Sequence, residues 1–305
     1  MKESFNELYT KLYKENFENL ELLRKKNKTK YLIIIGVVIL MFILMTVNPM
    51  FILIGIVIIT ICVFKDLITG KNKSTSKNDY VTYFKSNIIQ PLIENTIDGA
   101  MYNQYDGISH IDYRRAKYYD NEDRYRSEDK IVAPIIIDGE NKTTVEFCEV
   151  LTERESTDED GNTTYTTLFS GLAGQAKLNK SINSSVFIKR NGFMRKFSSS
   201  KVNMDMSEFE KIFDVEANDK ILAMRILTAD IMQDMIELYR KYGYIYEVHL
   251  IDDRLYMRIS TGPLFEPNIF KSSMEYKTIE KYYLVLKAFM KIVEKMYTTI
   301  DKLDV

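Results

Sequence analysis

The sequence has no tryptophan, only two histidines and two cysteines, and five prolines in 305 residues. Two cysteines cannot form a disulfide framework, and a chain of this length can bury a core without one. Aromatic packing falls to the 21 tyrosines and 16 phenylalanines. The formal net charge of -1 argues against general nucleic-acid binding, which needs a clustered basic surface.

The common signatures of catalysis and cofactor binding are missing as well. The sequence contains no HExxH, no CxxC pair, no GxSxG elbow, no phosphate-binding loop and no GxGxxG. His110 and His249 stand in unrelated contexts, so they do not form a paired-histidine metal site. We therefore predict no catalytic residue, no metal ligand and no cofactor, and we expect a protein that is not an enzyme.

One long segment carries no charged side chain: the 34 residues from Tyr31 to Phe64. A single helix of that length would extend about 51 Å, whereas the hydrocarbon core of a bilayer is about 30 Å thick. Asn48 and Pro49 lie near its centre, where proline breaks a helix and Asn-Pro favours a turn. This pattern predicts a transmembrane helical hairpin with helices over 31–47 and 50–66 and a membrane turn at Asn48-Pro49. A buried hairpin in a soluble protein is the alternative.

Basic residues flank the apolar segment on both sides. They are Arg24, Lys25, Lys26, Lys28 and Lys30 before it, and Lys65, Lys71, Lys73 and Lys77 after it. Because positive flanks stay on the cytoplasmic side, both termini are expected in the cytoplasm. The lipid bilayer is thus the first predicted partner, and the predicted location is a membrane that the chain crosses more than once.

The chain divides by pattern into four parts: 1–30, 31–66, 67–79 and 80–305. In the first, apolar residues recur at three- and four-residue steps over 3–23, which predicts an amphipathic helix. It either lies on a membrane or partner surface, or docks on the protein's own soluble domain. The second part is the hairpin, and the third is a polar linker.

The fourth part, 80–305, alternates strand and helix patterns. Strands are expected over 131–137, 144–152 and 163–172, the last two forming a long hairpin, and over 244–251 and 255–260. Helices are expected over 229–242, which Thr228 and Gly243 delimit, and over about 276–300. We predict an α+β domain rich in antiparallel sheet, with a capping helix and a long C-terminal helix.

Two polar clusters are candidate sites. A basic and aromatic stretch could contact anionic lipid headgroups or form a plain exposed loop; its residues are Lys189, Arg190, Phe193, Arg195, Lys196 and Phe197. Asp158, Asp160 and Asn162 resemble the start of a calcium loop, but Gly161 is fourth where that loop needs glycine sixth. A hairpin turn is the favoured interpretation of this second cluster.

Several short passages resemble a known family in their order. They are Ser127-Glu128-Asp129-Lys130-Ile131, Val145-Glu146-Phe147-Cys148-Glu149-Val150, Leu168-Phe169-Ser170-Gly171-Leu172, Phe213-Asp214-Val215-Glu216-Ala217, Arg225-Ile226-Leu227-Thr228 and Leu264-Phe265-Glu266-Pro267. The chain resembles the bacterial two-span membrane-protein family catalogued as domain of unknown function 3137, sometimes mislabelled galanin. The resemblance implies a bacterial cytoplasmic membrane and a LemA-like protein as partner, and it implies no chemistry.

Three functions fit these observations. The first is a membrane-anchored, non-enzymatic interaction or scaffold module on the cytoplasmic side, working with a protein partner or as a homo-oligomer. The second is a lipid- or ligand-sensing domain at the membrane surface. The third is an enzyme of unrecognised type, which would need a pocket of titratable groups with shifted pKa values.

Overall fold

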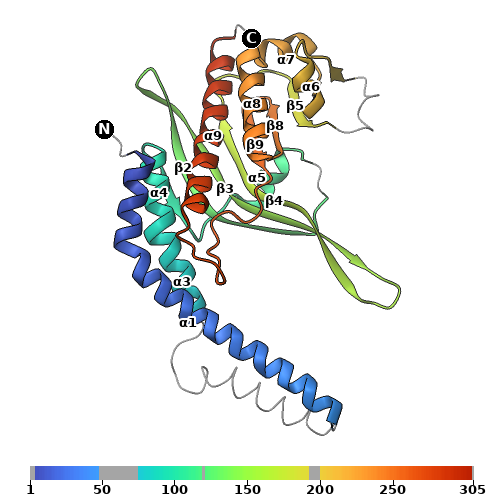
Figure 1. Cartoon of the computed structure of the whole chain (residues 1–305). Helices are drawn as coiled ribbons and strands as arrows, with labels where there is room; N and C mark the ends of the chain where they lie inside the picture. The colour runs from blue at the N-terminus through green and yellow to red at the C-terminus, as the bar shows by residue number, and fades with distance from the viewer. Residues whose placement is uncertain (1–3, 48–74, 119–120, 192–199, 304–305) are drawn as a thin grey trace. The chain divides into compact units, whose positions relative to one another are not determined.

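The structure, a computed structural model, describes residues 4–47, 75–118, 121–191 and 200–303 (Figure 1). It separates into two compact units. Unit 1 comprises residues up to Leu92 together with Glu266–Lys281, and unit 2 comprises Ile93–Phe265 and Tyr282–Val305.

Unit 1 is built on one long helix, α1 (Phe5–Val47). Its first half turns Leu8, Leu12 and Leu20 inward, and all three are buried. The predicted stripe thus docks on the protein's own chain, as the second interpretation expected. The hydroxyl of Tyr9 donates to the carbonyl of Met274 at 2.8 Å, and the ring of Phe5 lies 5.4 Å from that of Tyr276.

The predicted membrane hairpin is wrong for the part of the chain that the structure describes, where no helix combines the length and the apolarity needed to cross a bilayer. The expected helix over 31–47 is not separate, because no proline or glycine interrupts 24–30 and α1 continues through it. Within the described residues, the apolar part of α1 covers Tyr31–Val47, and the expected second helix over 50–66 lies outside them. The expectation that the chain crosses a membrane more than once depends on the hairpin and is wrong for the same reason. The predicted membrane turn at Asn48 and Pro49 lies outside the described residues.

The helical chain that follows includes a local widening. It consists of α3 (Thr75–Phe84), the π-helical turn η1 (Lys85–Ile89) and α4 (Gln90–Thr96). The N–H of Gln90 donates to the carbonyl of Lys85, five residues back. Pro91 has no N–H, and its ring would collide with a carbonyl of a regular helix, so the wider turn relieves the conflict without ending the helix.

Unit 2 is organised by one antiparallel sheet of nine strands, in the order β1-β2-β3-β4-β9-β8-β5-β7-β6. The strands are β1 (Met101–Asn103), β2 (Arg124–Ile137), β3 (Glu140–Thr157), β4 (Thr163–Lys177), β5 (Ser185–Arg190), β6 (Lys201–Val202), β7 (Phe213–Ala217), β8 (Tyr246–Ile251) and β9 (Arg254–Ile259). The short helices are α5 (His110–Arg115), α6 (Ser207–Ile212) and α7 (Lys220–Ile226). The expected α+β class with an antiparallel sheet is confirmed.

Tight turns fix the register of this sheet. Asp138 and Gly139 join β2 to β3 with φ values of 54° and 79°, as a two-residue hairpin turn with two positive φ angles requires. Asp252, with φ 54°, opens the turn between β8 and β9. Both turns follow strands that end at the predicted residues, Ile137 and Ile251.

Two long helices cover one face of the sheet: α8 (Ala229–Tyr242) and α9 (Tyr276–Asp301) (Figure 1). The hydroxyl oxygen of Thr228 accepts from the N–H of Ile231 at the start of α8, and Gly243 ends it at φ 67°, as predicted. Phe289 of α9 stacks on Phe147 of β3 with ring centroids 4.6 Å apart. The predicted C-terminal helix therefore packs on the sheet through its buried apolar side chains.

The opposite face is covered by α5 and its neighbouring loop. Cys148 follows Phe147 in β3 and so faces the other way. It packs in a buried cluster with Tyr113 of α5 and Phe169 of β4, and burial raises the pKa of its thiol to about 12. The guanidinium of Arg258 donates to the hydroxyl of Tyr113 at 2.9 Å, which ties α5 to β9.

Gly171 is predicted to be essential for the pairing of β4 with β9. Its φ is 155°, and a Cβ atom there would lie 2.0 Å from the carbonyl oxygen of Ile259. We expect Gly171→Ala to lower the free energy of unfolding by at least about 3 kcal/mol in urea denaturation. Gly161→Ala is the matched control, since φ is 81° and nothing lies within 4 Å; it should cost at most about 2 kcal/mol. Equal losses would contradict the steric argument.

Candidate interaction arm

The hairpin of β3 and β4 extends past both of its neighbours in the sheet. Beside β3, strand β2 reaches only to Arg124, which pairs with Glu153. Beside β4, strand β9 begins its pairing at Leu172. Beyond these points β3 and β4 pair only with each other, out to Thr157 and Thr163. We call residues 154–167 the arm; Figure 1 shows it projecting from the sheet.

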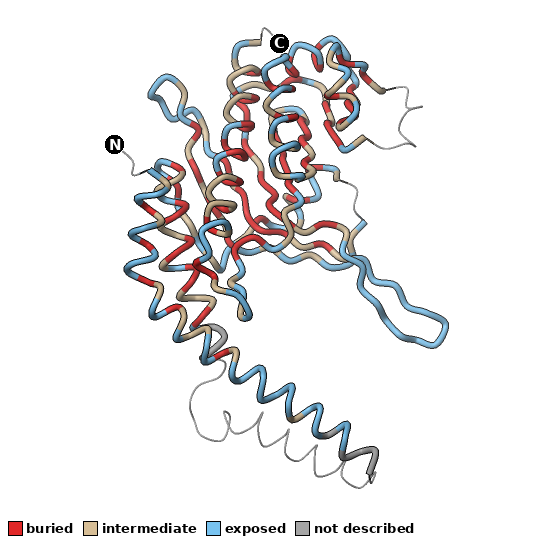
Figure 2. The backbone as a smooth tube through the Cα atoms, viewed as in Figure 1, coloured by how far each residue is buried: buried red, intermediate tan, exposed pale blue. Residues whose placement is uncertain are grey.

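Burial changes abruptly where the arm begins. Thr152 and Phe169 are buried, whereas every residue of the arm is exposed, so that Figure 2 colours it pale blue throughout. The change coincides with a bulge. Thr152 pairs with Phe169, but Glu153 pairs with Thr167, so that Leu168 is the extra residue of β4 and has no partner in β3. Because a bulge bends a strand and sharpens its twist, it directs the arm away from the sheet.

The tip of the arm is held by Asp158. Its Oδ1 accepts hydrogen bonds from the N–H groups of Asn162, at 2.8 Å, and Asp160, at 3.1 Å. The backbone and side-chain N–H groups of Asn162 hold the pKa of Asp158 below its usual value. These bonds, with Gly161 at φ 81°, make the tip an ordered turn, as the hairpin interpretation expected.

The base of the arm is braced by charge. The guanidinium of Arg124 lies 4.3 Å from the ring centroid of Tyr165. Arg124 and Arg126 also reach the carboxylate of Glu153, at 3.7 and 3.2 Å. Exposed pairs of this kind stabilise a fold by at most about 1 kcal/mol, so their effect is to orient the arm.

The arm combines an uneven charge with open edges. Glu155, Asp158, Glu159 and Asp160 are acidic, and Arg154 is its single basic residue. Among the described residues, no strand other than β3 pairs with 163–169, whereas the carbonyl of Ser170 accepts from the N–H of Gly262. A strand edge with unpaired N–H and C=O groups can accept a further strand from another chain. Chemically, the arm can therefore offer carboxylates and a backbone edge to a partner.

The basic and aromatic stretch that the sequence singles out is only partly described. Lys189 and Arg190 end β5, where Lys189 is buried with its Nζ 5.0 Å from the ring centroid of Phe187. Arg190 is exposed. The other four residues, Phe193, Arg195, Lys196 and Phe197, lie outside the described residues, so lipid contact by this stretch stays a prediction.

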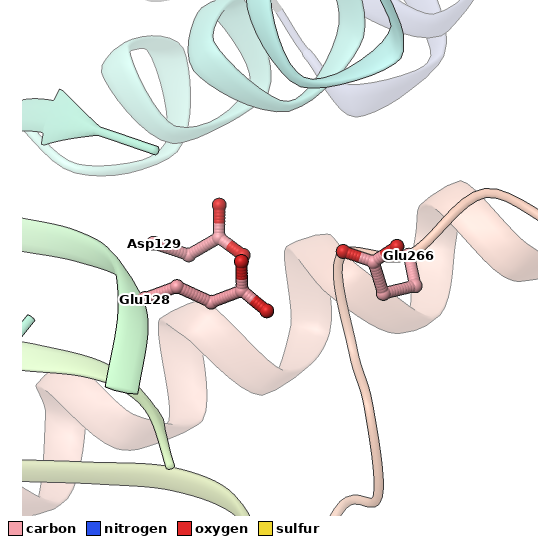
Figure 3. Close-up of side chains that lie close together, drawn as sticks. All are labelled: Glu128, Asp129 and Glu266. Carbon is pink, nitrogen blue, oxygen red and sulfur yellow. The ribbon is translucent and has the colours of Figure 1, made fainter. Parts of the chain in front are cut away.

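An acidic pair in β2 was not predicted as a site. Glu128 and Asp129, drawn in Figure 3, lie at an irregularity in the pairing of β2 with β3. Asp129 is fully buried at φ 60° and accepts a hydrogen bond from the hydroxyl of Tyr102, whose pKa burial raises. Glu266, drawn in the same figure, belongs to unit 1, where its carboxylate pairs with buried Lys85 at 2.7 Å.

Glu149 of β3 also has a role within the fold. It is buried, and its Oε1 accepts from the backbone N–H of Leu264 at 2.8 Å and from that of Phe265. The carboxylate thereby anchors the segment that follows β9. Sequence signals for such a role are absent, because the donors lie more than 110 residues away along the chain.

Removal of the arm should leave unit 2 intact. Replacing residues 155–165 by Asn-Gly keeps Arg154 paired with Thr166 across a two-residue turn. Since the arm buries nothing, we expect the thermal midpoint by circular dichroism to change by at most about 2 °C. A large loss of stability would show that the arm belongs to the core after all.

Comparisons with known proteins point to a family without an assigned function. Residues 167–297 match the family model described as "Protein of unknown function (DUF3137)". No curated protein matches the chain. Among solved structures, the mycobacterial trehalose monomycolate transport factor A, TtfA, aligns with 70% of this chain and 93% of its own, at 7% identity and a TM-score of 0.33. The resemblance to the domain-of-unknown-function family is thus confirmed over residues 167–297, while two membrane spans and a bacterial setting are not.

Proposed function

We propose that this protein is a non-enzymatic interaction module whose arm binds a basic surface on a protein partner. The observation that carries the proposal is the exposure of all of residues 154–167 in a paired, ordered hairpin. A two-stranded ribbon is at best marginally stable by itself, and this one adds no burial to unit 2. Binding gives such a ribbon a physical role that folding does not.

Charge supports the choice of partner. The carboxylates of the arm lie within a few residues of one another at its tip, and its nearest strong cations are at its base. A positively charged partner surface would be attracted over about 8–10 Å at physiological salt, and no buried ion would compete with it for the carboxylates of the arm. The open edge of β4 then allows backbone pairing once the surfaces meet.

The absence of catalytic signatures from the full sequence supports a binding role over an enzymatic one. A LemA-like protein stays a candidate for the partner through the family resemblance alone. The lipid- or ligand-sensing alternative rests on the basic and aromatic stretch that begins at Lys189 and Arg190, most of which lies outside the described residues.

Site-specific photo-crosslinking in cells tests the proposal. With p-benzoylphenylalanine in place of Tyr165, the full-length protein should form an adduct with a protein that has a basic surface. Neutralising the arm by Glu155→Gln, Glu159→Gln and Asp160→Asn should reduce this adduct about tenfold, because the attraction is electrostatic. Asp158 is left in place to preserve the turn.

The matched control neutralises three exposed carboxylates elsewhere, by Glu140→Gln, Glu237→Gln and Glu275→Gln, and should leave the adduct unchanged. The proposal fails if no adduct forms, if both triple variants behave alike, or if the adduct contains only a second copy of this chain.

A further inference from the structure

A cleft of about 540 Å³ opens beside α8 and α9 in unit 2. Three segments line it: the end of β2 with its turn, the start of α8, and the last turns of α9. These segments lie far apart in the sequence, so the fold creates the cleft. Its volume falls within the 300–1,000 Å³ range of small-molecule sites.

The two lysines that line the cleft already form ion pairs with Asp234. Asp234 of α8 receives the Nζ of Lys291 at 2.9 Å and also pairs with Lys295. Although burial acts in the opposite sense, these two lysines hold the pKa of Asp234 below its usual value. This one carboxylate offsets one of the two lysine charges, so a single positive charge remains at this wall of the cleft.

The remaining charge of the cleft is acidic. Asp138, Asp230 and Glu294 line it, and none of the three makes a side-chain ion pair among the described residues. Asp230 lies in the first turn of α8, where the helix dipole favours a carboxylate. Glu294 and Asp138 make no ion pair among the described residues, and three such carboxylates against one uncompensated lysine leave the cleft net negative; burial raises the pKa of Glu294.

The cleft also has apolar walls. Ile136 and Ile137 form one side, and Ile231 belongs to another. Ile136 is a large apolar side chain that is exposed at the cleft, so a bound ligand would cover it. Carboxylates beside aliphatic walls suit a molecule with a short hydrocarbon body and a cationic end.

We propose that this cleft binds a small aliphatic amine, with its ammonium group facing Glu294 and Asp138 and its carbon chain against the isoleucines. The proposal is independent of the arm. The ammonium supplies positive charge to a cleft that is net negative, and the ion pairs of Asp234 with Lys291 and Lys295 tie α8 to α9 at its wall. At pH values near the raised pKa of Glu294, binding should favour its ionised form and release a proton to solvent.

Isothermal titration calorimetry of the full-length protein with putrescine tests this. Measured in buffers of different ionisation enthalpy, binding should release a proton, and affinity should rise as the pH increases through the raised pKa of Glu294. Lys291, Lys295, Asp138, Asp230 and Asp234 are the charged groups around Glu294. Glu294→Gln should weaken binding about tenfold and abolish the proton release.

Asp138→Asn is the second variant, because asparagine keeps the positive φ of the turn while it removes the charge. It should weaken binding about threefold. Glu237→Gln, exposed on α8, is the control and should change nothing. The proposal is overturned if putrescine does not bind, if n-butanol or inorganic phosphate binds as well, or if Glu294→Gln binds putrescine like the unaltered protein.

Discussion

The hydrogen-bonded ladder between β3 and β4 is the constraint on which unit 2 depends. Its inner half carries Phe147, on which α9 packs through Phe289. Gly174 makes this contact possible, because a Cβ atom there would lie 2.8 Å from the Phe289 ring. The same ladder continues through the bulge at Leu168 into the exposed arm. One backbone structure therefore holds the core together at one end and presents a free ribbon at the other.

The carboxylates of unit 2 fall into two groups, those with hydrogen-bond donors or cations beside them and those that outnumber the cations near them. Buried carboxylates such as Asp129 and Glu149 have hydroxyl or backbone donors and serve the fold. Asp234 has two lysines. By contrast, the acids of the arm outnumber its one arginine, and those of the cleft outnumber its two lysines. Since unpaired charge near the surface adds nothing to folding, those two places are where binding is to be expected.

Local signals predicted much of the fold. Thr228 and Gly243 delimit α8, and Asp138-Gly139 and Asp252 mark hairpin turns, because caps and turns depend on neighbouring residues alone. The membrane hairpin was wrong: apolarity over 31–47 was taken for a separate spanning helix, whereas α1 continues through Lys25–Lys30. The long hairpin was predicted, but not that its outer half projects, because that depends on where β2 and β9 end. The cleft joins segments from β2, α8 and α9, and no local pattern could reveal it.

Hydrogen–deuterium exchange of the protein isolated from cells under gentle conditions tests the central claim most directly. Compared before and after a high-salt wash, the amides of residues 154–167 should be protected at first and exchange rapidly afterwards, while the amides around Phe147 stay protected in both. Exchange in the arm that is equally fast in both samples would show that it has no partner and would contradict the account.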